Sequence, residues 1–145
     1  MELLVAPGAG LDAGRVSFLT PPDRVFQVIA VRDIGRIVAG VFGAPDRYAG
    51  RTFDIAGDAI AGRGLAEQLT RAAGRPIEYS RLTASLPAQD EALGRLAALF
   101  EDGRLAGHAD LDALRAEFPS LLRFDDWLAG PGAPLLAAAL APAVR

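Results

Sequence analysis

Residues 25–57 constrain the fold more strongly than any other stretch of the chain. They open with VFQVIAV, a mostly apolar run rich in β-branched side chains that is typical of a strand buried on both faces. Apolar residues then recur with the spacing i, i+3, i+4, i+7 and i+8, which predicts one face of an amphipathic helix. They are Ile34, Ile37, Val38, Val41 and Phe42. Residues 51–56 alternate between polar and apolar side chains and predict a second strand.

Asp33 follows the first of these strands, and we interpret it as the N-cap of the helix. A carboxylate at that position accepts hydrogen bonds from free backbone N–H groups and faces the positive end of the helix dipole. Glycine and proline at Gly43, Pro45 and Gly50 then end the helix. Elsewhere the same kinds of signal predict strands at residues 15–19 and 76–81, a loop at residues 58–62, helices at residues 63–73 and 124–129, a helix that starts near Ser85 and Pro87 and ends at Gly103, and a helix capped by Asp110 and stopped by Pro119.

Together these elements predict a mixed α/β, helix-rich fold with about four short strands and four to six helices. At 145 residues, the chain has the length of one domain. We place this domain at residues 1–129, because the sequence GPGAP then breaks the pattern. Residues 130–145 form an Ala/Leu-rich tail, which we expect to be a short terminal helix or a frayed end. The strands at residues 15–19 and 25–31 could pair, but the length of the turn between them does not decide this.

Composition excludes several classes of function. The net charge is −3, with acidic and basic residues interspersed, whereas nucleic-acid binding needs a basic face. The absence of cysteine excludes disulfides, thiolate catalysis and cysteine-ligated metals, and it is compatible with a cytoplasmic location. The absence of lysine excludes Schiff-base and P-loop lysines. We recognise no signal peptide and no membrane-spanning run.

The glycines at positions 8, 10 and 14 superficially suggest a dinucleotide-binding loop. Such a loop needs a helix directly after the glycines, so that the helix N-terminus meets the pyrophosphate. Residues 15–19 instead alternate as a strand, and the glycine spacing differs by one residue. We therefore interpret this segment as a connecting loop.

Four segments resemble, in this order, the C-terminal, substrate-binding half of NmrA-like proteins, which are atypical relatives of the short-chain dehydrogenases/reductases. They are AVRDIGRIVAGVF, YAGRTFDIAGDAI, GLAEQLTRAAGRPIEYSRL and FPSLLRFDDWL. The resemblance covers residues 4–129 and implies a partial Rossmann-like fold. Separately, abundant Ala, Gly and Arg without Lys or Asn indicate a GC-rich bacterial genome. The chain departs from the family at Ala61 and Gly62, where a helix-capping threonine is usual. The N-terminal, dinucleotide-binding half of the family has no counterpart in this sequence.

The resemblance implies a relation to NAD(P)-dependent reductases or redox sensors. Because the dinucleotide-binding half is missing, we expect this chain alone to hold no cofactor, and NAD(P) is implied by the family only. The Tyr-x-x-x-Lys pair that short-chain dehydrogenases use for proton transfer is also missing. A half-domain of this kind exposes a sheet edge and an apolar face, so we expect a homodimer or a partner chain that covers them.

Seven residues are candidates for a site. His108, the only histidine, would suit acid–base catalysis at neutral pH, and Tyr79 and Asp33 are the other candidate catalytic groups. The candidate substrate-binding residues are Arg36, Asp54, Tyr48 and Trp127. Three of the seven have a structural alternative: His108 as a solvated loop histidine, Asp33 as a helix cap and Trp127 as part of the core. The remaining carboxylates sit at spacings that do not converge, so we expect no metal site.

These observations leave three functions open. The first is a substrate- or ligand-binding domain related to the NmrA-like proteins. The second is a cofactor-free enzyme, of isomerase or cyclase type, that acts on an apolar metabolite in a hydrophobic pocket. The third is a structural subunit without activity of its own. The sequence therefore leaves open whether the chain is an enzyme.

Overall fold

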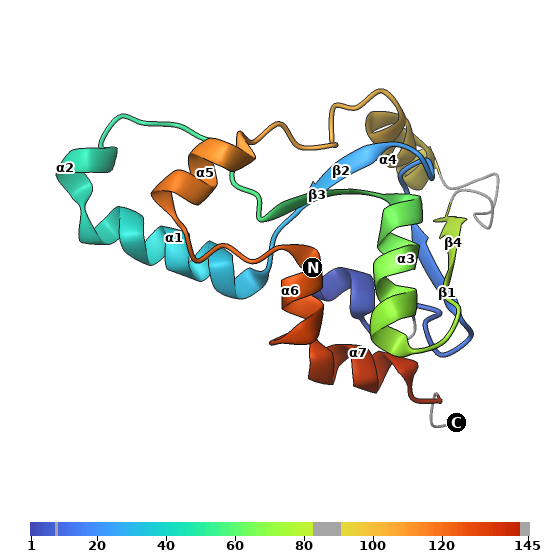
Figure 1. Ribbon diagram of the computed structural model, residues 1–145. Coiled ribbons are helices and arrows are strands. Elements are labelled where there is room, and N and C mark those ends of the chain that lie inside the picture. Colours follow the sequence, from blue (N-terminus) through green and yellow to red (C-terminus); the bar gives the residue numbers. More distant parts are fainter. Residues whose placement is uncertain (8, 83–90, 143–145) are drawn as a thin grey trace.

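The computed structural model describes residues 1–7, 9–82 and 91–142 (Figure 1). These residues form a mixed α/β, helix-rich fold, as the sequence predicts, with four strands and seven α-helices. The helix count exceeds our prediction because Pro45–Tyr48 forms a separate four-residue turn of helix. In chain order the elements are η1 (Glu2–Val5), β1 (Arg15–Phe18), β2 (Val25–Val28), α1 (Val31–Gly43), α2 (Pro45–Tyr48), β3 (Asp58–Ala61), α3 (Gly62–Ala73), β4 (Glu78–Arg81), α4 (Glu91–Glu101), α5 (Leu111–Glu117), α6 (Phe124–Ala129) and α7 (Ala133–Leu140).

The four strands form two separate two-stranded sheets. Strand β1 pairs in parallel with β4, and Val16 lies opposite Tyr79. Strand β2 pairs antiparallel with β3, and Phe26 lies opposite Ile60. The first two strands of the chain therefore do not pair with each other, which settles the question that the turn between them left open.

Helix α1 begins three residues earlier than the sequence suggests, and Asp33 is not its N-cap. Strand β2 ends at Val28, and Ala30 is the N-cap residue of the helix. The carboxylate of Glu2 accepts the N–H of Val31 at 3.1 Å, so the capping group comes from η1. Our prediction was wrong because a carboxylate 29 positions away in sequence provides the cap. Asp33 is instead fully buried in the first turn.

The prediction of a strand at residues 51–56 and a loop at residues 58–62 was also wrong. Residues 51–57 belong to neither sheet, while β3 occupies Asp58–Ala61. The change from loop to strand starts at Gly57, whose N–H donates to the carbonyl oxygen of Val28 at 2.8 Å. A strand needs a neighbouring strand for its backbone groups, and β2 lies beside residues 58–61 rather than beside residues 51–56.

Several local predictions are confirmed. Gly74 ends α3 in the left-handed conformation, with φ of 65°. Asp110 caps α5, because its carboxylate accepts hydrogen bonds from the N–H groups of Asp112 and Ala113. The predicted helix start at Ser85 and Pro87 lies outside the described residues. In the described part of the chain, no helix combines the length and apolarity needed to cross a membrane.

Buried side chains gather in two hydrophobic clusters. Cluster 1 joins η1, both sheets and helices α3, α6 and α7, with Phe124 and Trp127 at its centre. Helix α7 contributes Leu136 to this cluster, so residues of the predicted tail belong to the main core. Cluster 2 is smaller and joins α1 and α5 to the segment that connects α2 and β3. Figure 1 shows these elements together at the end of the molecule opposite β1 and β4.

Candidate functional site

An apolar pocket of about 340 Å³ opens between η1, β2, the start of α1 and the end of α4. Ligand pockets in proteins typically have volumes of about 300–1,000 Å³ and mostly apolar walls. Every residue that lines this pocket is apolar except Glu2 and Gln27. The apolar lining consists of Met1, Leu3, Leu4, Phe18, Phe26, Val28, Ile29, Val31, Ile34, Phe100 and Leu105.

Three phenyl rings form one wall of the apolar pocket. Phe18 stacks on Phe26 with ring centroids 4.8 Å apart, and it meets the edge of Phe100 at 5.3 Å. These rings come from β1, β2 and α4, so the wall forms only when distant parts of the chain meet. Leu3, Val31 and Leu105 also line the pocket and are 86%, 62% and 42% exposed. The pocket therefore presents apolar surface to solvent.

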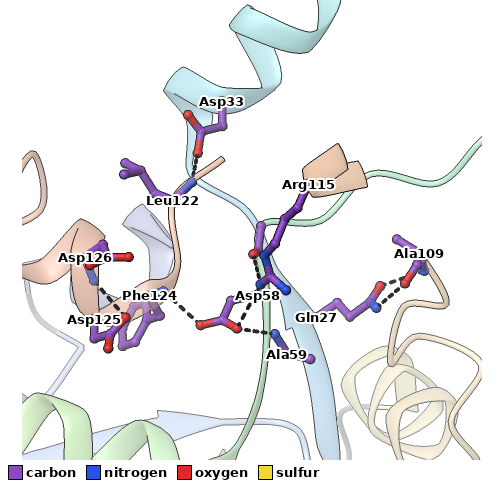
Figure 2. A network of polar contacts seen from close by, with 11 residues as sticks. Gln27, Asp33, Asp58, Ala59, Ala109, Arg115, Leu122, Phe124, Asp125 and Asp126 are labelled. Atoms are coloured by element: carbon purple, nitrogen blue, oxygen red, sulfur yellow. Dashed lines mark hydrogen bonds and ion pairs between the residues drawn. The ribbon is translucent and has the colours of Figure 1, made fainter. Parts of the chain in front are cut away.

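Both polar residues of the apolar pocket already have hydrogen-bond partners. The Gln27 amide donates to the carbonyl oxygen of Ala109 and accepts from its N–H, each at 2.8 Å (Figure 2). The Glu2 carboxylate accepts from Val31 and lies 3.3 Å from the N-terminal amine. Burial alone would raise the pKa of Glu2, but its hydrogen bonds and the N-terminal charge lower it. The lining of this pocket therefore fits an apolar ligand.

A second, polar pocket of about 140 Å³ lies beside cluster 2. It brings together His108 and Asp54, two of the residues that the sequence suggested for a site. Both side chains are exposed. The other residues that line it are Arg51, Phe53, Ala109, Asp110, Ala113, Leu114 and Glu117. Among them Asp110 is already committed to capping α5.

Charged and aromatic groups surround Glu117 at the edge of the polar pocket. Arg51 donates two hydrogen bonds to the Glu117 carboxylate, at 3.1 and 3.2 Å, and Arg47 lies 3.1 Å from it. Hydrogen bonding from Arg51 lowers the pKa of Glu117. The ring of Tyr48 lies 5.5 and 5.3 Å from the two guanidinium groups, and burial raises the pKa of its hydroxyl. Tyr48 therefore adjoins the polar pocket without lining it.

Asp33 and Arg36 lie apart from both His108 and Asp54. One Asp33 oxygen accepts the backbone N–H of Leu122 at 2.9 Å, and the other accepts from Arg36 at 3.2 Å. Arg36 also donates to the carbonyl oxygen of Ser120 at 3.3 Å. The two residues therefore tie α1 to the segment that precedes α6, as Figure 2 shows for Asp33.

Tyr79 and Trp127 make contacts that hold the fold together. The Tyr79 hydroxyl donates to the carbonyl oxygen of Thr20, and its ring covers Gly62 so closely that a Cβ there would lie 2.5 Å from it. Trp127 is 1% exposed, and its ring stacks on Phe124 with centroids 5.8 Å apart. Of the seven candidates, only His108 and Asp54 line a common pocket.

Burial raises the pKa of Tyr79 to about 12, although the Arg81 charge acts in the opposite direction. Since the ordinary value is 10.0, this neutral hydroxyl contributes stability that is fully present below pH 10.0 and is lost as the pH rises toward about 12. The chain has two tyrosines, so Tyr48→Phe isolates Tyr79. We expect tyrosinate absorbance in that variant to appear with a midpoint near 12 when folded and near 10.0 in urea. A folded midpoint near 10.0 would show that water reaches the hydroxyl.

In the described residues, no group of three or more His, Asp or Glu side chains is arranged to hold a metal ion. Fold and pockets together define a small, helix-rich α/β domain whose pockets include the apolar pocket and the polar pocket described above. No protein-family model matches the sequence, and no curated protein matches it either.

The sequence reasoning missed the apolar pocket and the arginines around Glu117. The walls of the apolar pocket come from segments between Met1 and Leu105, and each of them taken alone resembles ordinary core. Arg51 and Glu117 are 66 residues apart, which no local motif relates. One sequence signal does point to the polar pocket. The alternation in residues 51–56 favours an extended conformation, and in this segment Phe53 and Asp54 line the pocket together with residues of α5.

Proposed function

We propose that this chain is a ligand-binding domain that takes up a small apolar molecule in the apolar pocket. The lining of that pocket carries the proposal, because its only two polar residues are occupied by Ala109 and Val31. No charged group of the lining is left to recognise a polar substrate. The ligand class is therefore a neutral, largely hydrocarbon molecule of the size of a single ring system or a short chain.

The resemblance to the substrate-binding half of NmrA-like proteins supports the same function. In that family a separate half binds the dinucleotide, and we propose that this chain binds no NAD(P) by itself. Figure 1 shows β1 following the glycine-containing loop, where a dinucleotide fingerprint would need a helix. We place this function in the cytoplasm, with which a cysteine-free composition is compatible.

A second candidate function is a cofactor-free enzyme of isomerase or cyclase type. The presence of His108 and Asp54 in the lining of one polar pocket favours it, because an imidazole and a carboxylate that face the same bound molecule are suited to acid–base catalysis. Native mass spectrometry of the purified chain identifies a retained molecule, and chromatography that resolves isomers of equal mass separates the two functions. A molecule that is unchanged after incubation with the chain supports binding alone, whereas its conversion to an isomer supports catalysis.

Leu105→Arg should weaken binding of the neutral dye N-phenylnaphthylamine by about tenfold. Leu105 lines the apolar pocket, and arginine removes apolar contact surface and brings a charge to the pocket. Dye fluorescence, followed as a function of protein concentration, measures the affinity.

Leu135→Arg is the matched control for this variant. Leu135 is 43% exposed, against 42% for Leu105, but it lies on α7 and does not line the pocket. The control should bind the dye as the unmodified chain does. Equal affinities for the two arginine variants would contradict the proposed site.

A further inference from the structure

The apolar pocket has one aromatic corner, and the other apolar residues of its lining carry no ring. Phe18 and Phe26 are stacked, with an angle of 23° between their planes. Phe100 meets Phe18 at 70°, close to a right angle. Two nearly parallel rings and a third ring across them therefore form this corner of the pocket.

Two of the three rings have surface left for a ligand. Phe26 is 2% exposed and belongs to cluster 1, so its ring is already used in the core. Phe18 and Phe100 are only half-buried. Among the described residues, Phe100 is a member of neither cluster 1 nor cluster 2. A large aromatic side chain that lies outside the core and borders a pocket is suited to packing against a bound molecule.

The charge distribution of a phenyl ring makes this corner selective. Its two faces carry partial negative charge and its edge carries partial positive charge, so aromatic rings prefer offset-stacked or edge-to-face arrangements. A flat ligand ring in the corner can stack against one phenyl ring while it meets another edge to face. A saturated ring of the same size has no such charge distribution, and it gains only from the burial of its apolar surface.

We propose that the ligand of the apolar pocket contains an aromatic hydrocarbon ring, and that Phe100 is the residue that selects for this ring. The proposal rests on the proposed function, because it names the class of molecule that the same pocket takes up. The side chains opposite the aromatic corner, among them Leu4, Val28 and Ile34, fit an alkyl part of the same molecule. An alkylbenzene is the simplest compound with both parts.

n-Butylbenzene and n-butylcyclohexane are the test pair, because they share one carbon skeleton and differ only in the ring. Displacement of the dye N-phenylnaphthylamine from the full chain, followed by fluorescence in sealed cells, measures the affinity of each. Dividing each affinity by the partition coefficient of the compound between hexane and water removes the effect of general hydrophobicity. We expect the corrected affinity of butylbenzene to be higher by about two- to tenfold.

Phe100→Leu tests the residue that we assign to this selection. Leucine keeps an apolar side chain on α4 but removes the ring, so the ratio of the two corrected affinities should fall at least about twofold. Phe42→Leu is the matched control. Phe42 is 79% exposed on α1 and does not line the pocket, so its replacement should leave the ratio unchanged.

Equal corrected affinities in the unmodified chain would overturn the inference, as would a ratio that is the same in Phe100→Leu. In both cases binding of the dye would leave the proposed function intact. A chain that bound neither the dye nor the two hydrocarbons would overturn the proposed function as well, so the two failures are distinguishable. If Phe100→Leu does not fold, the ratio measured on the unmodified chain decides whether the pocket selects an aromatic ring.

Discussion

Trp127→Ala is expected to lower the free energy of unfolding by about 3–5 kcal/mol, the cost typical of removing a large buried aromatic side chain. Trp127 is 1% exposed at the centre of cluster 1, stacked on Phe124. Gly132 also packs against the indole, so tightly that a Cβ there would lie 2.5 Å from it. Little can therefore collapse into the space that alanine leaves. Since domains of this size are stable by only about 5–15 kcal/mol, the variant should be severely destabilised.

Chemical denaturation followed by circular dichroism measures this loss, because the variant has no tryptophan left to report by fluorescence. Leu135→Ala is the control. Leu135 is 43% exposed, and its truncation should change stability by less than about 0.5 kcal/mol. In whatever fraction of Trp127→Ala stays folded, dye affinity should match that of the unmodified chain. A stable Trp127→Ala variant with weakened dye binding would return Trp127 to the substrate-binding role that the sequence suggested.

Predictions from the sequence succeeded where the deciding chemistry is local. Gly74 ends α3 and Asp110 caps α5, because a left-handed residue and a capping carboxylate act on backbone groups within their own turn. The mixed, helix-rich α/β class follows from the same local periods. The positions of the strands do not follow from these local periods, because Phe26 pairs with Ile60, a residue far from it in the sequence. Residues 51–56 and 58–61 both tolerate an extended backbone, and only the second lies beside β2.

The candidate site shows the same difference between local features, which the sequence predicts, and long-range contacts, which it does not. The chemistry of His108 and Asp54 suggests them as site residues, and the fold brings them to one pocket although they are distant in sequence. The position of Asp33 after a strand suggests a cap or a site residue, but its partner is Leu122, 89 residues further along the chain. No periodicity within residues 25–57 carries information about that contact. In the sequence, a buried carboxylate such as Asp33 therefore has the same pattern as a helix cap or a site residue. In the structure, it holds two segments together.

Asp33→Ala is expected to lower the free energy of unfolding by about 2–3 kcal/mol, because it leaves a partly buried backbone N–H without its acceptor and Arg36 without its carboxylate. Asp33 is fully buried, and the N–H of Leu122 lies 2.9 Å from its oxygen. That bond fixes the segment leading into α6, next to the bond between the N–H of Phe124 and Asp58 (Figure 2). Both bonds position α6 and hence the tryptophan that it carries into cluster 1. The fluorescence of that single tryptophan during urea denaturation measures the loss.

Two further variants separate the backbone bond from the ion pair. Arg36→Ala removes the ion pair and the hydrogen bond from Arg36 to the Ser120 carbonyl oxygen but keeps the bond between Asp33 and Leu122. Because the Arg36 side chain is 39% exposed, the variant should cost less than about 1 kcal/mol. Asp33→Asn retains a carbonyl oxygen for Leu122 and should fall between the two alanine variants. Equal, small losses in Asp33→Ala and Arg36→Ala would show that the bond to Leu122 contributes nothing. A large loss in Asp33→Ala alone shows that this carboxylate joins α1 to the segment before α6.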